Sequence, residues 1–517
     1  MKARKFSKPL SLALAVTAGV FTAPAASAES QAPLWPLQSF KSTPITAPYM
    51  NVTKNAQTEP GHIFISPHDT LRGTGFPMIY AEDGQLIWRG PAVNVSAFQP
   101  QMLDGEPVLA YWDGYLFPGF GFGGITILNS SYDQIYRVTL PGGGGDGEEE
   151  GRFVTIAESQ TFDSYIDIHE SQITSEGTIL VTAVNVTRVD LSSIGGPVDG
   201  WVQDGLVYEI DIKTNEVLFR WSAVEHLDQV RLEDSMLPLE DSGQNITAPY
   251  EYPHLNSVMK YGDSYLVSSR FMCSLYFIDK NGQVIWHLHG QTGGDFTLST
   301  EARFCYQHNA RFITSTESKI RLQLHNNENA DYTSPTTLTT GLILDLDMKQ
   351  RAVTAVQKFW DAAEPVFAQS QGSYQNLTNG HVLLQHGAVP KLEEYDQEGA
   401  LVLRARFGFD SAIQSYRGYK ANWVGRPRTR PDVFACAGGE EGETVVYASW
   451  NGATDVQSWR VMARTGAGGL REVATVPRNG FETRIQLDKA VEHVVVAAVG
   501  GVGDGTKSNA VAVAKSC

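Results

Sequence analysis

The 517-residue sequence lacks several features that would assign it to a common class. Charged residues make up only 19%, and 57 acidic against 40 basic side chains give a net charge of −17. Without a basic stripe, such an acidic chain argues against general binding to nucleic acids or anionic membranes. Beyond the N-terminus no run of 18 apolar residues occurs, so no membrane span is predicted. The serine-hydrolase motif Gly-x-Ser-x-Gly, the zinc-protease motif His-Glu-x-x-His and the phosphate-binding Gly-Lys-Ser/Thr are missing as well.

The N-terminus has the layout of a secretory signal. Four basic residues fall within the first eight positions, an apolar run covers 10–21, and Ala26-Ser27-Ala28 has the small-x-small pattern of a cleavage site. The alternative is a membrane anchor, but the apolar run is too short to span a bilayer as a helix. We therefore predict a signal peptide over 1–28 and a protein that is secreted or resides in the secretory pathway, a vacuole included.

Sequons for N-glycosylation agree with this route. Six behind a signal sequence indicate a eukaryotic secretory pathway and predict that their asparagines lie on exposed turns. The six are Asn51, Asn94, Asn129, Asn185, Asn245 and Asn376.

Cysteine is scarce, with four residues in the whole chain. In an oxidising compartment two disulfides are expected, and chain order suggests Cys273–Cys305 and Cys436–Cys517, although four cysteines allow three pairings. A metal site made of Cys273, Cys305 and His308 is the alternative. Its spacing fits no zinc pattern, so no metal is predicted.

A hairpin phrase recurs along the chain: an apolar strand, an aspartate, a turn with Gly or Asn, and a second strand that often ends in Trp. Its spacing of roughly 50–70 residues predicts the blades of a β-propeller, although unrelated hairpins in a sandwich are an alternative. A second phrase, polar-Gly-x-x-Leu, is interpreted as the strand before each hairpin. The repeated aspartates are Asp83, Asp211, Asp279, Asp345 and Asp396, and the glycines are Gly114, Gly177, Gly262 and Gly380.

Two stretches depart from this repeat. Gly142–Gly151 is glycine-rich and acidic and is expected to be a flexible surface loop. From about 432 the runs become short and alternating, which predicts a small β-sandwich over 432–517 after a propeller over 29–431. A Cys436–Cys517 bridge would tie its first strand to its last.

Four polar segments contain side chains that could take part in catalysis. They are Asp167–Glu170, Tyr252–Ser257, Ser268–Arg270 and Tyr306–Arg311. A single histidine is more often a hydrogen-bonded structural residue than a catalyst. His169 and His254, however, each stand eight residues before a repeat glycine, and equivalent positions in successive blades line one end of the central channel. We therefore expect three histidines and an arginine to face each other there. They are His169, His254, Arg270 and His308.

These segments resemble the arylsulfotransferase family, especially its eukaryotic secreted branch. The motifs Asp-x-His-Glu, His-x-Asn-Ser, Ser-Ser-Arg and Gln-His-x-Ala-Arg occur in the family's order, and the family's closing motif matches Tyr416–Tyr419 and Trp423–Pro427. The similarity covers roughly 60–430. It implies an all-β fold with a six-bladed propeller that moves a sulfuryl group from an aryl sulfate to a phenol without a nucleotide donor or other cofactor.

By motif, His308 would be the nucleophile that is transiently sulfated. His254, Arg270 and His169 would hold the sulfuryl oxygens and the oxygen of the leaving phenolate. Arg270 offers charged donors, and imidazoles can donate or accept a proton. Six further residues are candidates for contacting the substrate: Tyr252, Asn256, Tyr306, Arg311, Tyr374 and His386.

Four residues depart from the family's pattern, namely His289, Asn309, His325 and His386. Extra histidines near the channel would fit a changed substrate or reaction, which leaves two alternatives to the transferase. The same propeller could act as a cyclase or pericyclase, such as a hetero-Diels-Alderase, on a phenolic compound in secondary metabolism, by proximity and polarisation. It could also bind a ligand without catalysis. The sequence does not predict an oligomeric state.

Overall fold

The computed structural model describes residues 35–70, 73–142, 153–157, 160–329, 337–410, 412–438 and 442–517. The predicted signal peptide and nearly all of the Gly142–Gly151 stretch lie outside these ranges. Within them the chain is nearly all-β. The helices found there are single 3-10 turns: η1 (Ser192–Ile194), η2 (Val224–His226), η3 (Leu232–Asp234) and η4 (Thr300–Ala302). Over the same ranges, no helix is long and apolar enough to cross a membrane.

Six four-stranded antiparallel sets account for most of the strands in the described ranges. The first joins β4 (His62–Ile65), β7 (Met78–Tyr80) and β8 (Leu86–Arg89) to β32 (Gly418–Ala421). The second has β9 (Val95–Leu103), β10 (Glu106–Phe117), β11 (Phe120–Leu128) and β12 (Gln134–Val138). The third has β13 (Ile166–Ile173), β14 (Thr178–Val189), β15 (Gly200–Asp211) and β16 (Val217–Ser222).

The other three sets continue in chain order. The fourth has β18 (Leu255–Tyr261), β19 (Ser264–Ser269), β20 (Ser274–Ile278) and β21 (Val284–His289). The fifth has β23 (His308–Ser315), β24 (Lys319–Asn326), β25 (Thr340–Asp347) and β26 (Ala352–Phe359). The sixth has β27 (Ser373–Asn376), β28 (Val382–Gln385), β29 (Lys391–Tyr395) and β30 (Leu401–Arg406).

Short strands extend these sheets or pair separately. β3 (Asn51–Lys54), β17 (Tyr250–Glu251) and β22 (Thr297–Leu298) pair with β30, β15 and β26. β5 (His68–Asp69) lies between β6 (Thr74–Gly75) and β31 (Ile413–Gln414), and β1 (Leu37–Ser39) pairs with β2 (Thr46–Pro48).

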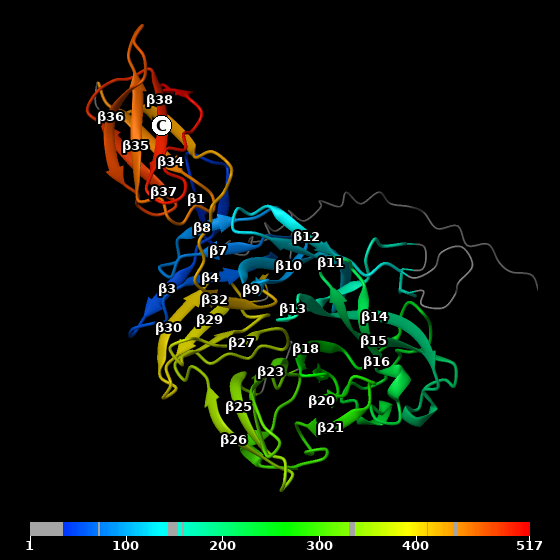
Figure 1. Cartoon of the computed structure of the whole chain (residues 1–517). Helices are drawn as coiled ribbons and strands as arrows, with labels where there is room; N and C mark the ends of the chain where they lie inside the picture. The colour runs from blue at the N-terminus through cyan, green and yellow to red at the C-terminus, as the bar shows by residue number, and fades with distance from the viewer. Residues whose placement is uncertain are drawn as a thin grey trace, which may run out of the picture. The chain divides into compact units, whose positions relative to one another are not determined.

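The six sets lie around a common centre (Figure 1). The strands nearest to it contact one another in sequence, from β9 to β13, β18, β23, β27 and β32 and from β32 back to β9. Hydrophobic clusters form between neighbouring sets; one of them combines Leu266 of β19 with Leu322 of β24. Because the apolar side chains pack between the sheets, the ends of the central strands can carry polar groups.

Each predicted hairpin is the outer strand pair of a set, and four of the five turn at the predicted aspartate; β25–β26 turns at Asp347 instead, because Asp345 lies inside β25. At β20–β21 the Asp279 carboxylate accepts hydrogen bonds from the backbone N–H groups of Asn281 and Gln283 at 2.8 and 2.9 Å, and Gly282 takes φ = 84°. An aspartate followed by glycine therefore shapes the turn. The long interval between Asp83 and Asp211 contains one additional set, whose outer hairpin turns at Asn129 instead.

The phrase at Gly114 lies in β10, the strand before the β11–β12 hairpin, as predicted, but its glycine differs from the other three. Gly177, Gly262 and Gly380 lie in turns with positive φ, whereas Gly114 lies inside β10. A Cβ there would be 2.3 Å from the carbonyl oxygen of Phe122, so the glycine permits close approach of β11. The turn of that set is at Asp104–Gly105.

The circle is closed by strands from opposite ends of the sequence. β32 pairs antiparallel with β4, opposing Gly418 to Ile65, and β31 pairs with β5, opposing Gln414 to His68. This pairing brings 413–421 beside 62–69, which places late residues of the chain at the centre.

After 432 the strands form two further sheets. One contains β33 (Asp432–Ala437), β34 (Thr444–Ser449) and β37 (Glu482–Leu487). The other contains β36 (Arg471–Pro477), β35 (Ser458–Arg464), β38 (His493–Val499) and β39 (Val511–Ala512). Side chains of both share one buried cluster that includes Trp450 and Trp459.

Both expected disulfides are present. Cys273 is bonded to Cys305, which rules out the alternative metal site with His308, and Cys436 is bonded to Cys517, which ties β33 to the last residue. The described residues contain no group of three His, Cys, Asp or Glu side chains suited to a metal ion.

The sequons occupy mixed positions. Asn129 and Asn245 lie in turns, as predicted, and Asn51 is an exposed residue of β3. The expectation of a turn is wrong for Asn185, which is half-buried within β14 and accepts a hydrogen bond from Val154 N–H at 2.8 Å. It is also wrong for two others: Asn376 ends strand β27, and Asn94 is half-buried just before β9.

Candidate active site

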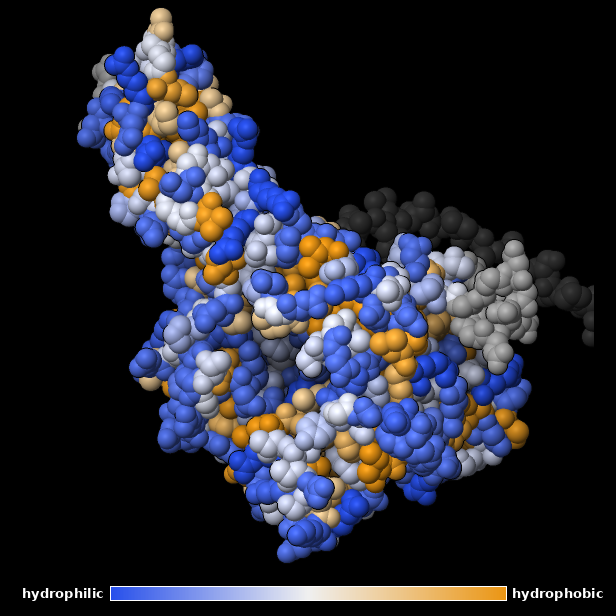
Figure 2. All heavy atoms as spheres, in the orientation of Figure 1, coloured by the Kyte–Doolittle hydropathy of each residue, from blue (hydrophilic) through white to orange (hydrophobic). Residues whose placement is uncertain are grey.

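A cavity of about 500 Å³ lies where the central strands meet, and the face shown in Figure 2 is hollowed near that centre. All four residues predicted to face each other line this cavity. His169 lies in β13, His254 directly precedes β18, Arg270 directly follows β19, and His308 begins β23. Residues more than 130 positions apart in the sequence thus line the same cavity.

His308 is held as a neutral imidazole with a defined tautomer. The backbone N–H of Gln371 donates to Nε2 at 3.1 Å, so this nitrogen carries the lone pair. On the other side Nδ1 donates to Asn327 Oδ1 at 2.7 Å, and the Asn327 amide nitrogen donates to the carbonyls of Ala368 and Gln371. Burial lowers the pKa of His308 well below its usual value, and the charge of Arg270 lowers it further. A neutral imidazole is a competent nucleophile.

Two other histidines are each paired with a carboxylate. His169 Nδ1 contacts Asp167, and His254 Nδ1 contacts Glu251. The two rings lie edge to face, with centroids 4.8 Å apart. Burial lowers the pKa of His254, and the Glu251 carboxylate opposes part of this effect. With Nδ1 taken by a carboxylate, the Nε2 atom of each ring is the one left for proton exchange.

Asp167 is itself held in place, because Gly121 N–H donates to its Oδ1 at 2.9 Å. For Glu251, burial alone would raise the pKa, but His254 and Arg270 lower it below its usual value. Both carboxylates therefore have partners that orient them toward their histidines.

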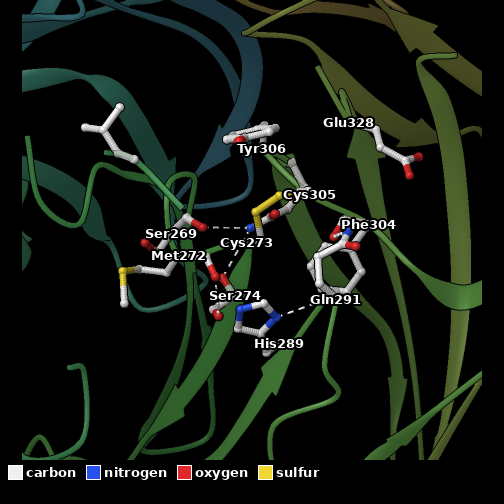
Figure 3. Close-up of a disulfide and its surroundings, with 12 residues drawn as sticks. Ser269, Met272, Cys273, Ser274, His289, Gln291, Phe304, Cys305, Tyr306 and Glu328 are labelled. Carbon is white, nitrogen blue, oxygen red and sulfur yellow. Dashed lines mark hydrogen bonds between the residues drawn. A yellow bond between two sulfur atoms is a disulfide. The ribbon is translucent and has the colours of Figure 1, made fainter. Parts of the chain in front are cut away.

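Arg270 and His308 are joined through the Cys273–Cys305 disulfide (Figure 3). Arg270 lies three residues before Cys273, and His308 lies three residues after Cys305. The Cys273 N–H donates to the Arg270 carbonyl at 3.1 Å, and the Arg270 N–H donates to the His254 carbonyl at 2.9 Å. The guanidinium donates to the Gln369 carbonyl at 3.0 Å and lies over the Phe271 ring. These contacts fix the cation next to the histidines.

A fully buried carboxylate supports the site from behind. Glu170 accepts from Arg417 Nη1 at 2.7 Å and from Arg311 Nη2 at 2.6 Å. Burial alone would raise its pKa, but the two guanidiniums hold it below its usual value. Arg417 also donates to the carbonyls of His169 and Asn256, both at 2.9 Å. This network couples β13, β18, β23 and the segment before β32.

None of the six predicted substrate contacts lines the cavity. Tyr252 and Tyr374 are buried in hydrophobic clusters, and Arg311 is engaged with Glu170. Asn256 is buried and donates to the Gln307 carbonyl at 2.6 Å. Tyr306 lies beside the disulfide (Figure 3). The side chains of these candidates thus lie outside the cavity wall.

Of the six, His386 belongs to a separate buried pair. Its Nδ1 contacts His325 Nε2 at 3.2 Å, and its Nε2 contacts Glu393 at 2.9 Å. Burial lowers the pKa of His325 to about 3, which favours its neutral form, and both histidines are buried and do not line the cavity.

The remaining departures from the family pattern also lie outside the cavity wall. His289 ends β21, where its Nδ1 accepts from the backbone N–H groups of Gln291 and Thr292 (Figure 3). Asn309 is buried, and its Oδ1 accepts from the Tyr374 backbone N–H at 3.1 Å.

Sequence reasoning missed most of the cavity wall. Most of the wall residues that were missed lie outside the repeat phrases and motifs; the exceptions are Leu116 in the phrase at Gly114, Ile168 in Asp167–Glu170 and Tyr416 in the closing motif. The residues missed are Ser66, His68, Thr70, Val95, Ser96, Leu116, Phe117, Pro118, Gly119, Ile168, Ser370, Gln371, Gln414 and Tyr416.

Comparison with known proteins adds one strong similarity. The sequence profile of a family described as Arylsulfotransferase (ASST) matches residues 99–408, which is more than half of the chain. No curated protein matches the sequence.

Similarities to solved structures are weak. A mutant of the GH43 protein BlXynB from Bacillus licheniformis is 9% identical, with a TM-score of 0.30, over 81% of this chain and 89% of that one. A Penicillium chrysogenum alpha-L-arabinanase complexed with arabinobiose is 9% identical, with a TM-score of 0.33, over 76% and 94%. At these scores neither likeness supports an argument about this chain.

Proposed function

Because the chain belongs to the arylsulfotransferase family, we propose that it transfers a sulfuryl group from an aryl sulfate to a phenol through a covalent intermediate on His308. The observation that carries the proposal is the state of His308, a neutral ring whose Nε2 lone pair lies at a cavity shared with Arg270 and two carboxylate-paired histidines. This is the arrangement that nucleophilic attack on an anionic ester needs.

We further propose that the six four-stranded sets are the blades of a six-bladed β-propeller over 29–431. The closed circle of contacts among the central strands supports this fold. The two sheets after 432 share one hydrophobic cluster, which supports a small β-sandwich over 432–517.

In the first step, His308 Nε2 attacks sulfur as the bond from sulfur to the aryl oxygen breaks. An N–S bond forms, and the Nδ1 proton stays on its hydrogen bond to Asn327. The leaving phenolate takes a proton from protonated His169, whose positive charge the Asp167 carboxylate stabilises. Arg270 donates hydrogen bonds to the equatorial oxygens, where charge builds up during in-line transfer, and His254 adds a donor when its Nε2 binds a proton.

In the second step, now-neutral His169 removes the proton of an acceptor phenol. The phenol oxygen attacks sulfur, the N–S bond breaks, and His308 regains its lone pair. The Gln371 N–H donates to that lone pair, so attack on sulfur has to displace this hydrogen bond. Loss of one preorganised donor such as Arg270 is expected to lower kcat by about 10²–10³-fold.

The secretory route is part of the proposal. Two disulfides agree with an oxidising compartment, and the signal peptide and sequons point the same way. Expression in a eukaryotic host followed by glycosidase treatment tests it: we expect secretion and a loss of mass. Retention of the folded protein in the cytosol would contradict the route, and secretion without any glycan would contradict glycosylation alone.

The function is tested with 4-nitrophenyl sulfate and a panel of phenols. We expect release of nitrophenol, and intact-mass analysis should detect an added sulfuryl group that His308→Ala abolishes. His493→Ala, in β38 of the C-terminal sheets, is the matched control. Transfer that persists in His308→Ala, or a folded wild type that is inactive with several donors, would overturn the proposal. Covalent chemistry on His308 is what separates this function from the cyclase and ligand-binding alternatives.

A further inference from the structure

We propose that Ser66, His68 and Tyr416 form a polar subsite of the cavity that binds a second oxygen substituent on the aromatic ring. The preferred acceptors would then be dihydroxylated aromatics such as hydroquinone and catechol rather than phenols with apolar substituents. Transfer to these acceptors rests on the proposed function, whereas their preferred binding at this subsite does not.

The three residues come from the segments that close the circle. Pairing of β5 with β31 and of β4 with β32 fixes these segments beside each other. The Ser66 N–H donates to Ser415 Oγ at 3.0 Å, next to Tyr416. The Tyr416 ring lies edge-on to His169 and His308, with centroids 5.4 and 6.3 Å away. The subsite therefore adjoins the reacting groups without belonging to the four family residues.

Each member carries a buried polar atom that is unsatisfied. Ser66 Oγ, His68 Nδ1 and Tyr416 Oη have no hydrogen-bond partner in the described structure. A buried polar group left unpaired is destabilising, so a ligand oxygen that pairs with it binds more favourably. Rotation of the Ser66 hydroxyl or the His68 ring turns its polar atom toward the cavity that both residues line. A ligand oxygen at this point would supply the missing partner.

The rest of the wall suits the ring itself. Val95, Leu116, Phe117 and Ile168 line the same cavity and offer apolar surface to an aromatic face. An aromatic ring that carries a hydroxyl group on one edge fits a cavity with apolar walls and one polar subsite. A site that hydrogen-bonds a substrate hydroxyl discriminates against an analogue that lacks it, because the protein groups are then left unpaired.

Matched pairs of acceptors of nearly equal size test the proposal: hydroquinone against 4-methylphenol, and catechol against 2-methylphenol. Binding is measured by titration calorimetry without a donor, and transfer as kcat/KM with 4-nitrophenyl sulfate. One hydrogen bond to a buried group predicts a preference of about 10–100-fold for the hydroxylated member in both assays. Tyr416→Phe and Ser66→Ala should each reduce the ratio by about tenfold.

Tyr276→Phe is the control. Its hydroxyl is also buried without a hydrogen-bond partner, but it lies in a hydrophobic cluster and does not line the cavity. Equal binding of both members of a pair, or equal effects of Tyr416→Phe and Tyr276→Phe on the ratio, would overturn the subsite. Preferential binding without any transfer would support the subsite and overturn the proposed reaction, whereas transfer without preference would overturn the subsite alone.

Discussion

Replacing Glu170 by glutamine should destabilise the protein strongly, although the change is nearly isosteric. The carboxylate is fully buried and compensates two guanidiniums, of which Arg417 is also fully buried. It accepts five hydrogen bonds, three from these guanidiniums and two from the backbone N–H groups of Ser171 and Val258. An amide puts its NH₂ group against one of these donors and leaves the arginines without a counter-charge.

Breaking a buried ion pair from one side costs about 3–5 kcal/mol. With an unfolding entropy of about 2.1 cal/mol/K per residue, a chain of this length loses about 1 °C in Tm per kcal/mol. We therefore expect Tm to fall by about 3–5 °C. Glu225→Gln is the control, because Glu225 forms an exposed pair with Arg220, and such pairs contribute about 0–1 kcal/mol.

The pH dependence gives an independent check. Because the pKa of Glu170 is lower in the folded state than in the unfolded state, its contribution to stability is complete above the unfolded pKa, about 4.3. It is lost as pH falls through the folded value. The wild type should lose stability in acid more steeply than Glu170→Gln. A change in Tm no larger than that of Glu225→Gln, with the same acid slope as wild type, would refute the assignment of Glu170 as the centre of the supporting network.

Three more outcomes are expected. Asn327→Ala removes the acceptor that sets the tautomer of His308 and should slow formation of the sulfated enzyme by about 10–100-fold, measured in single turnover with Tm as the control. Since the pKa of His308 is lowered, the amount of sulfated enzyme should not decrease between pH 7.5 and 6.5; a decrease with an apparent pKa near 6.5 would contradict the neutral state. Replacing Cys273 and Cys305 by serine should lower the free energy of unfolding by about 3–4 kcal/mol, measured by denaturation, since their bond closes a loop across a separation of 32 residues.

Local sequence patterns predicted the features that depend on residues close together in the sequence, namely the hairpin turns and the positions of two histidines. An aspartate followed by glycine or asparagine predicted the outer hairpins, because the carboxylate accepts from the backbone N–H groups of its own turn, as at Asp279. Histidines at a constant distance from the turn glycines, His169 and His254, lie at the cavity because equivalent positions in successive sets meet at the centre.

The predictions failed for residues whose place in the fold depends on the direction of the side chain or on pairing between strands far apart in the sequence. Tyr252 is two residues before His254, but its hydroxyl donates to the Val230 carbonyl within the core. Asp345 resembles the turn aspartates in sequence, but it lies inside β25 and pairs with Arg321 of the neighbouring strand. His68 reaches the cavity through pairing of β5 with β31, some 340 residues later in the chain, which no local pattern indicates.

Closure of the circle by β32 has a consequence for biosynthesis. Domains generally begin to fold from the N-terminus while the chain is still being made. Here the strand that pairs with β4, and the arginine that holds the carbonyls of His169 and Asn256, are encoded after residue 416. A nascent chain that contains all four cavity residues of the family motif but ends before 416 lacks the pairing of β32 with β4 and the hydrogen bonds from Arg417. The cavity is therefore complete only after 416–421 has been translated, and a truncation just before 416 removes these contacts while leaving most of the sheets encoded.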